Sequence, residues 1–192
     1  MQRIYQEEGK ELTEMFRRMK ERHVATSLDL AAIDAKSEAG RADWKAILSR
    51  VLPYVVFFVP SVEELCFMLD RERYEVWTER AAGRDITEVI SLEEVRPLAD
   101  TALSMGAKVV LIKCGAPGIY YKTADEEKLA PVCTQLGLFV DEWAGKEGFE
   151  RSFVPERILS GTGAGDTSIA AFLVSALEGA GLKEAAQMAT AT

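Results

Sequence analysis

The fold of this chain is decided by one stretch, Ser160-Gly161-Thr162-Gly163-Ala164-Gly165-Asp166-Thr167. Apolar residues recur at helical spacing directly after it, so the glycines fall where a loop enters a helix. The amides of a helix's first turn have no partner inside the helix, and the helix dipole adds positive potential there. The stretch is therefore suited to holding an anionic phosphate group.

Two familiar phosphate-binding loops do not fit this stretch. A P-loop ends in Gly-Lys-Ser/Thr, whereas this chain has Asp166 in place of the lysine. The dinucleotide-binding fingerprint needs a third glycine, and Asp166 occupies that position too. A carboxylate beside a phosphate fits the task of a general base, which accepts a proton from an alcohol attacking the terminal phosphorus of ATP. The alternative is that Asp166 only favours the helix N-terminus while the glycines make a tight turn.

The core of the stretch, Gly163-Ala164-Gly165-Asp166, resembles the Gly-Ala-Gly-Asp core of the ribokinase-like (PfkB) sugar and nucleoside kinases. The resemblance implies that the amides of Gly163, Ala164 and Gly165 form the anion hole for the transferred phosphoryl group. It implies that Asp166 is the catalytic base and that Thr162, with the glycines, contacts ATP. The chain departs from the family at Ser160 and Gly161, which replace an aspartate and a threonine, and this affects the hydrogen bonds that support the loop.

A second match follows the apolar run 54–59. Pro60-Ser61-Val62-Glu63-Glu64 resembles the family's Pro-Asn-x-x-Glu segment. The resemblance implies that Glu64 acts on Mg²⁺ through water and so organises the ion around the ATP phosphates. Ser61 and Glu64 also have the spacing of a capping box, which needs no ligand. Both interpretations stay open at the level of sequence.

A third match, residues 108–121, reads as a strand, a glycine turn and a second strand, and it resembles the family's strand-turn-strand beside the nucleotide. The resemblance implies that Lys113 faces the ATP phosphates and that Gly115 lies beside the nucleotide. Otherwise, Lys113 is a solvated lysine at a strand end and Gly115 serves only the turn. Asp29, at the end of an earlier strand, either borders the same crevice or acts as a cap or turn residue.

The composition narrows the function classes. The chain has 192 residues, 48% of them apolar, and a formal net charge of −8, which argues against a nucleic-acid or membrane-surface partner. Three widely spaced cysteines and one histidine support neither a disulfide framework nor a zinc site. The charged N-terminus, residues 1–22, is unlike a secretory signal. We therefore expect a cytoplasmic protein.

The alternation of helix-like and strand-like periodicity predicts a layered α/β fold, helix-sheet-helix, with a mostly parallel sheet. The predicted helices are 6–22, 42–52, 60–69 and one after Ser91, and the predicted strands are 24–29, 54–59 and 109–112. Residues 123–151 are expected to form a peripheral loop that packs its own aromatic residues, the alternative being an insertion near the acceptor substrate of a kinase. Ligands of parallel sheets sit at the carboxyl ends of the strands, so Glu64, Lys113 and the glycine loop should converge.

The resemblance implies one ribokinase-like domain over residues 1–192, truncated relative to the family pattern. The N-terminal strands and lid are missing, and the C-terminus stops before the family's last helix. An unpaired sheet edge then favours either association, such as a homo-oligomer, or local disorder. The leading functional hypothesis is an ATP- and Mg²⁺-dependent phosphotransferase acting on the hydroxyl of a small sugar-like alcohol, or the nucleotide-binding part of one. The alternatives are a nucleoside or vitamin kinase and a non-catalytic nucleotide-binding module.

Overall fold

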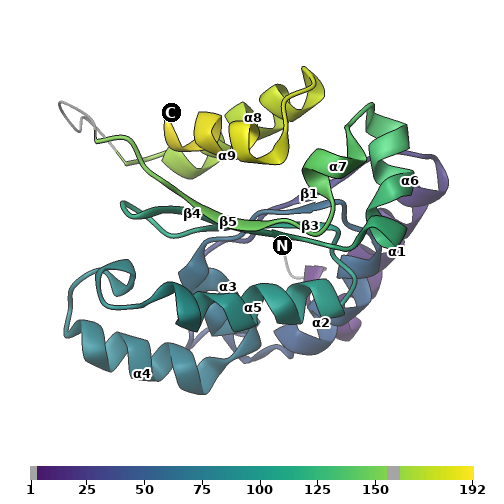
Figure 1. Ribbon diagram of the computed structural model, residues 1–192. Coiled ribbons are helices and arrows are strands. Elements are labelled where there is room, and N and C mark those ends of the chain that lie inside the picture. Colours follow the sequence, from purple (N-terminus) through teal and green to yellow (C-terminus); the bar gives the residue numbers. More distant parts are fainter. Residues whose placement is uncertain (1–3, 155–160) are drawn as a thin grey trace.

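One mixed sheet carries helices on both of its faces (Figure 1). The structure is a computed structural model and describes residues 4–154 and 161–192. Within these ranges five strands are arranged in the order β1-β2-β3-β4-β5. Their bounds are β1 Ser27–Leu28, β2 Phe57–Phe58, β3 Val109–Lys113, β4 Gly118–Thr123 and β5 Glu147–Arg151. The layered α/β prediction is confirmed.

The pairing pattern divides the sheet into two halves. β1 pairs with β2 and β2 with β3 in parallel, whereas β3–β4 and β4–β5 are antiparallel. The short glycine turn between β3 and β4 imposes the antiparallel arrangement, because parallel neighbours need a longer crossover. The sheet is therefore partly parallel, and its parallel part is β1–β3, where the candidate site residues lie.

Two hydrophobic clusters lie on opposite faces of the sheet. The first packs against α1 Lys10–Glu21, α2 Trp44–Val51, α3 Val62–Leu69, α4 Arg71–Ala81 and α5 Leu92–Ser104. The second packs against α6 Glu126–Leu136, α7 Val140–Trp143, α8 Ala164–Leu177 and α9 Leu182–Thr190. Neighbouring residues of β2 divide between the two clusters, Phe57 facing the second and Phe58 the first. This alternation is what a sheet covered on both faces requires.

The predicted elements are present, but the first two strands are shorter than expected. β1 and β2 have two residues each. β2 starts later than predicted because the chain before it turns through a 3-10 helix at Leu52–Tyr54 that contains Pro53. The first predicted helix divides into a 3-10 turn, Gln6–Gly9, and α1, since Gly9 takes a left-handed conformation with φ 75°. Helix α4 was not predicted from the sequence.

The prediction of a peripheral loop over residues 123–151 is wrong. This segment contains α6, α7 and the strand β5. Trp143 is fully buried in the second cluster, where its ring meets Phe57 and Phe172 edge-on. Of the three aromatic residues in the segment, only Phe139 is largely exposed, at 64%. The segment completes the sheet and covers one of its faces.

The helices in the described ranges are all too short or too polar to cross a bilayer.

Candidate functional site

The carboxyl ends of β1, β2 and β3 meet at one edge of the sheet, because the three strands are parallel. Asp29 follows β1, Ser61 and Glu64 follow β2, and Lys113 ends β3. An isolated parallel bridge joins Ser61 to Lys113, and the Lys113 amide donates to the Pro60 carbonyl at 2.9 Å. The backbone thus brings together the segments that the sequence analysis singled out.

An ion pair spans this edge. Lys113 Nζ lies 2.6 Å from Asp29 Oδ2, and the two side chains are only 18% and 30% exposed. β2 separates their strands, so the pair reaches across roughly 10 Å of sheet. The second carboxylate oxygen of Asp29 accepts from the Leu30 amide at 2.8 Å. Asp29 therefore agrees with both predictions made for it: it is a turn residue, and it borders the crevice at the strand ends.

The charges at this edge influence one another. Burial raises the pKa of the Asp29 carboxyl, the hydrogen bond and charge of Lys113 oppose that rise, and the negative charge of Glu64 adds to it. Asp29 and Glu64 are thus close enough for their carboxylates to repel. A cation between or beside them would relieve that repulsion.

Glu64 forms the capping box that its spacing predicts. Its Oε2 accepts from the Ser61 amide at 3.1 Å, and its own amide donates to Ser61 Oγ at 3.3 Å. The bond to the Ser61 amide uses one carboxylate oxygen, Oε2. The capping interpretation is confirmed. The capping role and the magnesium role of Glu64 do not exclude each other, and the magnesium role stays a proposal.

The glycine stretch enters α8 through a left-handed residue. Gly163 is the N-cap, with φ 82°, and no side chain caps the helix. The first amide with an acceptor in the helix is that of Thr167, which donates to the Gly163 carbonyl at 2.9 Å. The Ala164 amide instead turns to the Gly161 carbonyl at 3.3 Å. The geometry of a helix start leaves Gly165 and Asp166 with amides that lack acceptors in the helix.

Lys113 lies against this helix start. A methyl group built on Gly165 would be 3.5 Å from Lys113 Nζ, so the ammonium group adjoins the first turn of α8. The side chain of Asp166, one residue further, is exposed. Thr162 is exposed as well, and Ser160 lies outside the described residues. The structure therefore brings Asp29, Glu64, Lys113 and Gly165 together at one edge of the sheet. The side chain of Asp166 is exposed to solvent.

Gly115 occupies the turn between β3 and β4. Its φ of 62° is left-handed, and a side chain there would approach Thr87 Oγ1 within 3.0 Å. The Gly118 amide donates to the Gly115 carbonyl at 3.2 Å and closes the turn. The turn alone accounts for the presence of a glycine at position 115. The nucleotide-binding role of Gly115 therefore stays a prediction.

An apolar cavity of about 470 Å³ adjoins Asp29 on the side of the loop after β1. Its walls include Leu30, Ile33, Trp44 and Met68. Tyr5, Asp29, Asp34 and Ser37 add polar groups to the otherwise apolar lining. No pattern in the sequence predicted this cavity.

The residues at this edge fit a bound phosphate chain. Amides without acceptors in their own helix and an adjacent ammonium group are the donors that anionic oxygens need. The described residues contain no cluster of three or more His, Cys, Asp or Glu that could enclose a metal. Mg²⁺ commonly keeps several waters and binds through one or two carboxylates together with phosphates, an arrangement that Asp29 and Glu64 can serve.

The chain belongs to the pfkB family of carbohydrate kinases, whose sequence profile matches residues 10–192. None of the curated proteins matches it in sequence.

Solved structures show the ribokinase-like fold. Arabidopsis thaliana ribokinase, complexed with ribose and ATP, superposes with a TM-score of 0.60 at 19% identity, over 93% of this chain and 43% of its own. A PfkB protein from Polaromonas sp. JS666 gives 0.59 at 19% identity, over 95% and 46%. Aminoimidazole riboside kinase from Salmonella enterica gives 0.57 at 19%, over 93% and 48%. The chain thus spans less than half the length of these relatives.

Proposed function

We propose that this chain supplies the nucleotide side of a sugar kinase, in which the terminal phosphate of ATP is transferred to a hydroxyl of a small sugar-like acceptor. One observation carries the proposal: Lys113 lies against the first turn of α8 and is paired with Asp29, a carboxylate that also senses the negative charge of Glu64. Donors for phosphate oxygens and carboxylates for a metal are the components that phosphoryl transfer needs. Membership of the pfkB family supports the same reaction type.

In the proposed reaction the amides of Gly165 and Asp166 donate to the oxygens of the transferred phosphoryl group. Lys113 adds a positive charge at that point, while Asp29 holds its ammonium group in place. Such fixed donors stabilise charge as it develops, without reorganisation at the moment of transfer. Asp166 accepts the proton of the attacking hydroxyl.

Mg²⁺ would neutralise charge on the phosphates when bound. Glu64 would hold it through water, while its Oε2 accepts from the Ser61 amide. Asp29 is a second carboxylate on the same side of the site.

A non-catalytic nucleotide-binding module is the second candidate, and one observation favours it. Asp166 is exposed, so the described residues of this chain do not enclose its carboxylate with an acceptor hydroxyl. Transfer requires both reactants to be held in line, whereas phosphate binding requires only the edge described above. A nucleoside acceptor is the third candidate, since one structural relative is an aminoimidazole riboside kinase.

The test has two measurements on the full chain. Calorimetric titration with Mg-ATP measures binding, and a transfer assay over a panel of sugars and nucleosides measures turnover. We expect binding, and we expect Asp166→Asn to lower any transfer rate about a hundredfold or more while ATP affinity is kept. Asp141→Asn, at an exposed aspartate in the first turn of α7, is the matched control and should change neither.

The outcomes separate the three candidates. Binding without transfer to any acceptor supports the non-catalytic module. Transfer that is unaffected by Asp166→Asn removes this residue from the mechanism. Absence of ATP binding overturns the assignment of the sheet edge as a phosphate site.

A further inference from the structure

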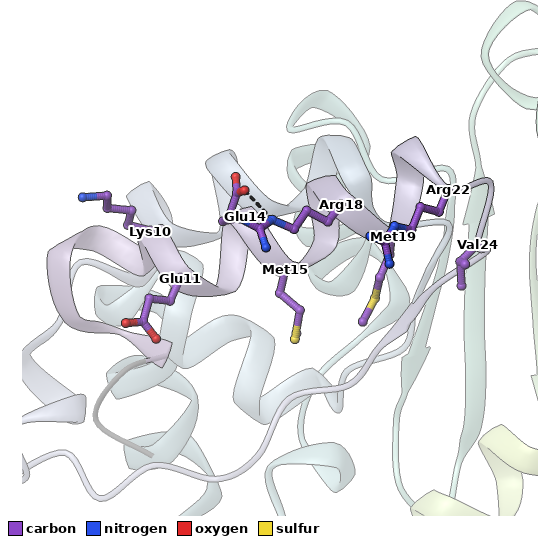
Figure 2. Close-up of a pocket in the computed structure, with 8 residues that line it drawn as sticks. All are labelled: Lys10, Glu11, Glu14, Met15, Arg18, Met19, Arg22 and Val24. Atoms are coloured by element: carbon purple, nitrogen blue, oxygen red, sulfur yellow. Dashed lines mark hydrogen bonds and ion pairs between the residues drawn. The ribbon is translucent and has the colours of Figure 1, made fainter.

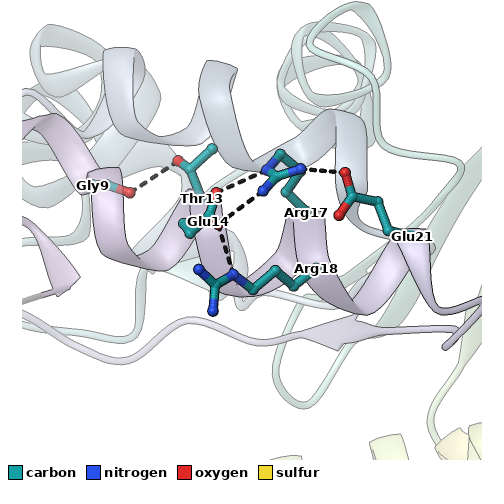
Figure 3. Close-up of polar contacts among 6 residues, drawn as sticks. All are labelled: Gly9, Thr13, Glu14, Arg17, Arg18 and Glu21. Atoms are coloured by element: carbon teal, nitrogen blue, oxygen red, sulfur yellow. Dashed lines mark hydrogen bonds and ion pairs between the residues drawn. The ribbon is translucent and has the colours of Figure 1, made fainter.

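We draw no further inference here: the strongest candidate, the groove of about 770 Å³ between α1 and the segment that leads into β1 (Figure 2), carries nothing, because Glu14 in it already pairs with two arginines of the same helix (Figure 3) and nothing in the part of the chain that the structure describes shows what covers the exposed side chains of Met15 and Val24.

Discussion

Glu147 on β5 connects the sheet to α5 and to its neighbour β4. Its carboxylate contacts Arg96 Nε at 2.6 Å and Lys122 Nζ at 3.0 Å. The hydrogen bond from Lys122, followed by that from Arg96, lowers the pKa of Glu147 from 4.5 to about 2. Because the folded-state pKa is below the unfolded one, the stabilisation is complete above about pH 4.5 and is lost as the pH falls towards about 2.

We therefore expect Glu147→Gln to lower the free energy of unfolding by about 1 kcal/mol at neutral pH, since the partly exposed pair is screened by solvent. The difference from the wild type should disappear as the pH approaches about 2. Urea denaturation across this pH range measures it. Glu79→Gln, at an exposed glutamate of α4, is the control, and an equally large effect there would contradict the assignment to this network.

Substitution of Lys113 best distinguishes a lysine that binds phosphate from one that only neutralises Asp29. Lys113→Met keeps the length of the side chain and removes the charge that lies against α8. We expect the affinity for ATP to fall about tenfold or more, because a charge-assisted contact to phosphate is lost. The pKa of Asp29 should rise further, since the Lys113 bond that opposes the effect of burial is gone. Calorimetry measures the first effect and carbon NMR of the carboxyl the second.

Lys183→Met on α9 serves as the control for Lys113→Met. Unchanged ATP affinity in Lys113→Met, together with a raised pKa of Asp29, would mean that the lysine only neutralises Asp29.

At the residue scale, the sequence predicted the convergence of Glu64, Lys113 and the glycine loop but not the Asp29–Lys113 ion pair. Convergence follows from strand polarity, which apolar runs and helical crossovers reveal. The pair depends on the order of β1, β2 and β3, which places Asp29 and Lys113 two strands apart. Strand order is a tertiary property, so a carboxylate at one strand end and a lysine at another could only be noted as candidates.

At the scale of the element, the start of α8 depends on two glycines with different physical roles. Gly163 has φ 82°, and a side chain there meets nothing within 4 Å, so only its backbone conformation favours glycine. Gly163→Ala should therefore destabilise the protein by about 1 kcal/mol. Gly165 lies inside the helix without a positive φ, so Gly165→Ala should stabilise it by up to about 1 kcal/mol. Thermal denaturation compares the two variants.

The same pair of variants separates folding from binding. The methyl group of Gly165→Ala would lie 3.5 Å from Lys113 Nζ, over the amides that the proposal assigns to the phosphate. We expect this variant to be more stable and yet to bind ATP more weakly. Unchanged ATP binding in Gly165→Ala would place the phosphates elsewhere.

Elements with a strong periodic pattern were predictable, and those defined by distant partners were not. Helices α2, α3 and α5 follow apolar spacing and caps such as Ser61 and Ser91. Helix α4 is mostly charged, so its pattern was weak, although its N-cap Asp70 and the buried Trp77 were available as signals. β5 is a strand because it pairs with β4, and its half-buried residues give no clear alternation.

At the scale of the whole molecule, the two hydrophobic clusters share the sheet as a common wall. Leu65 is fully buried in the first cluster and Leu129 in the second. Because β2 and β3 contribute side chains to both clusters, loss of packing on one face should loosen the strands that support the other. We propose that residues 1–192 unfold as a single domain.

Tryptophan fluorescence tests this proposal, since Trp77 belongs to the first cluster and Trp143 to the second. Two reporter variants each keep one of them, W44F with W143F and W44F with W77F. We expect both to show the same urea transition, and we expect Leu65→Ala or Leu129→Ala to shift that transition in both reporters by about 2–5 kcal/mol. If Leu65→Ala shifts only the Trp77 transition, the sheet does not couple its two faces and the clusters are separate folding units.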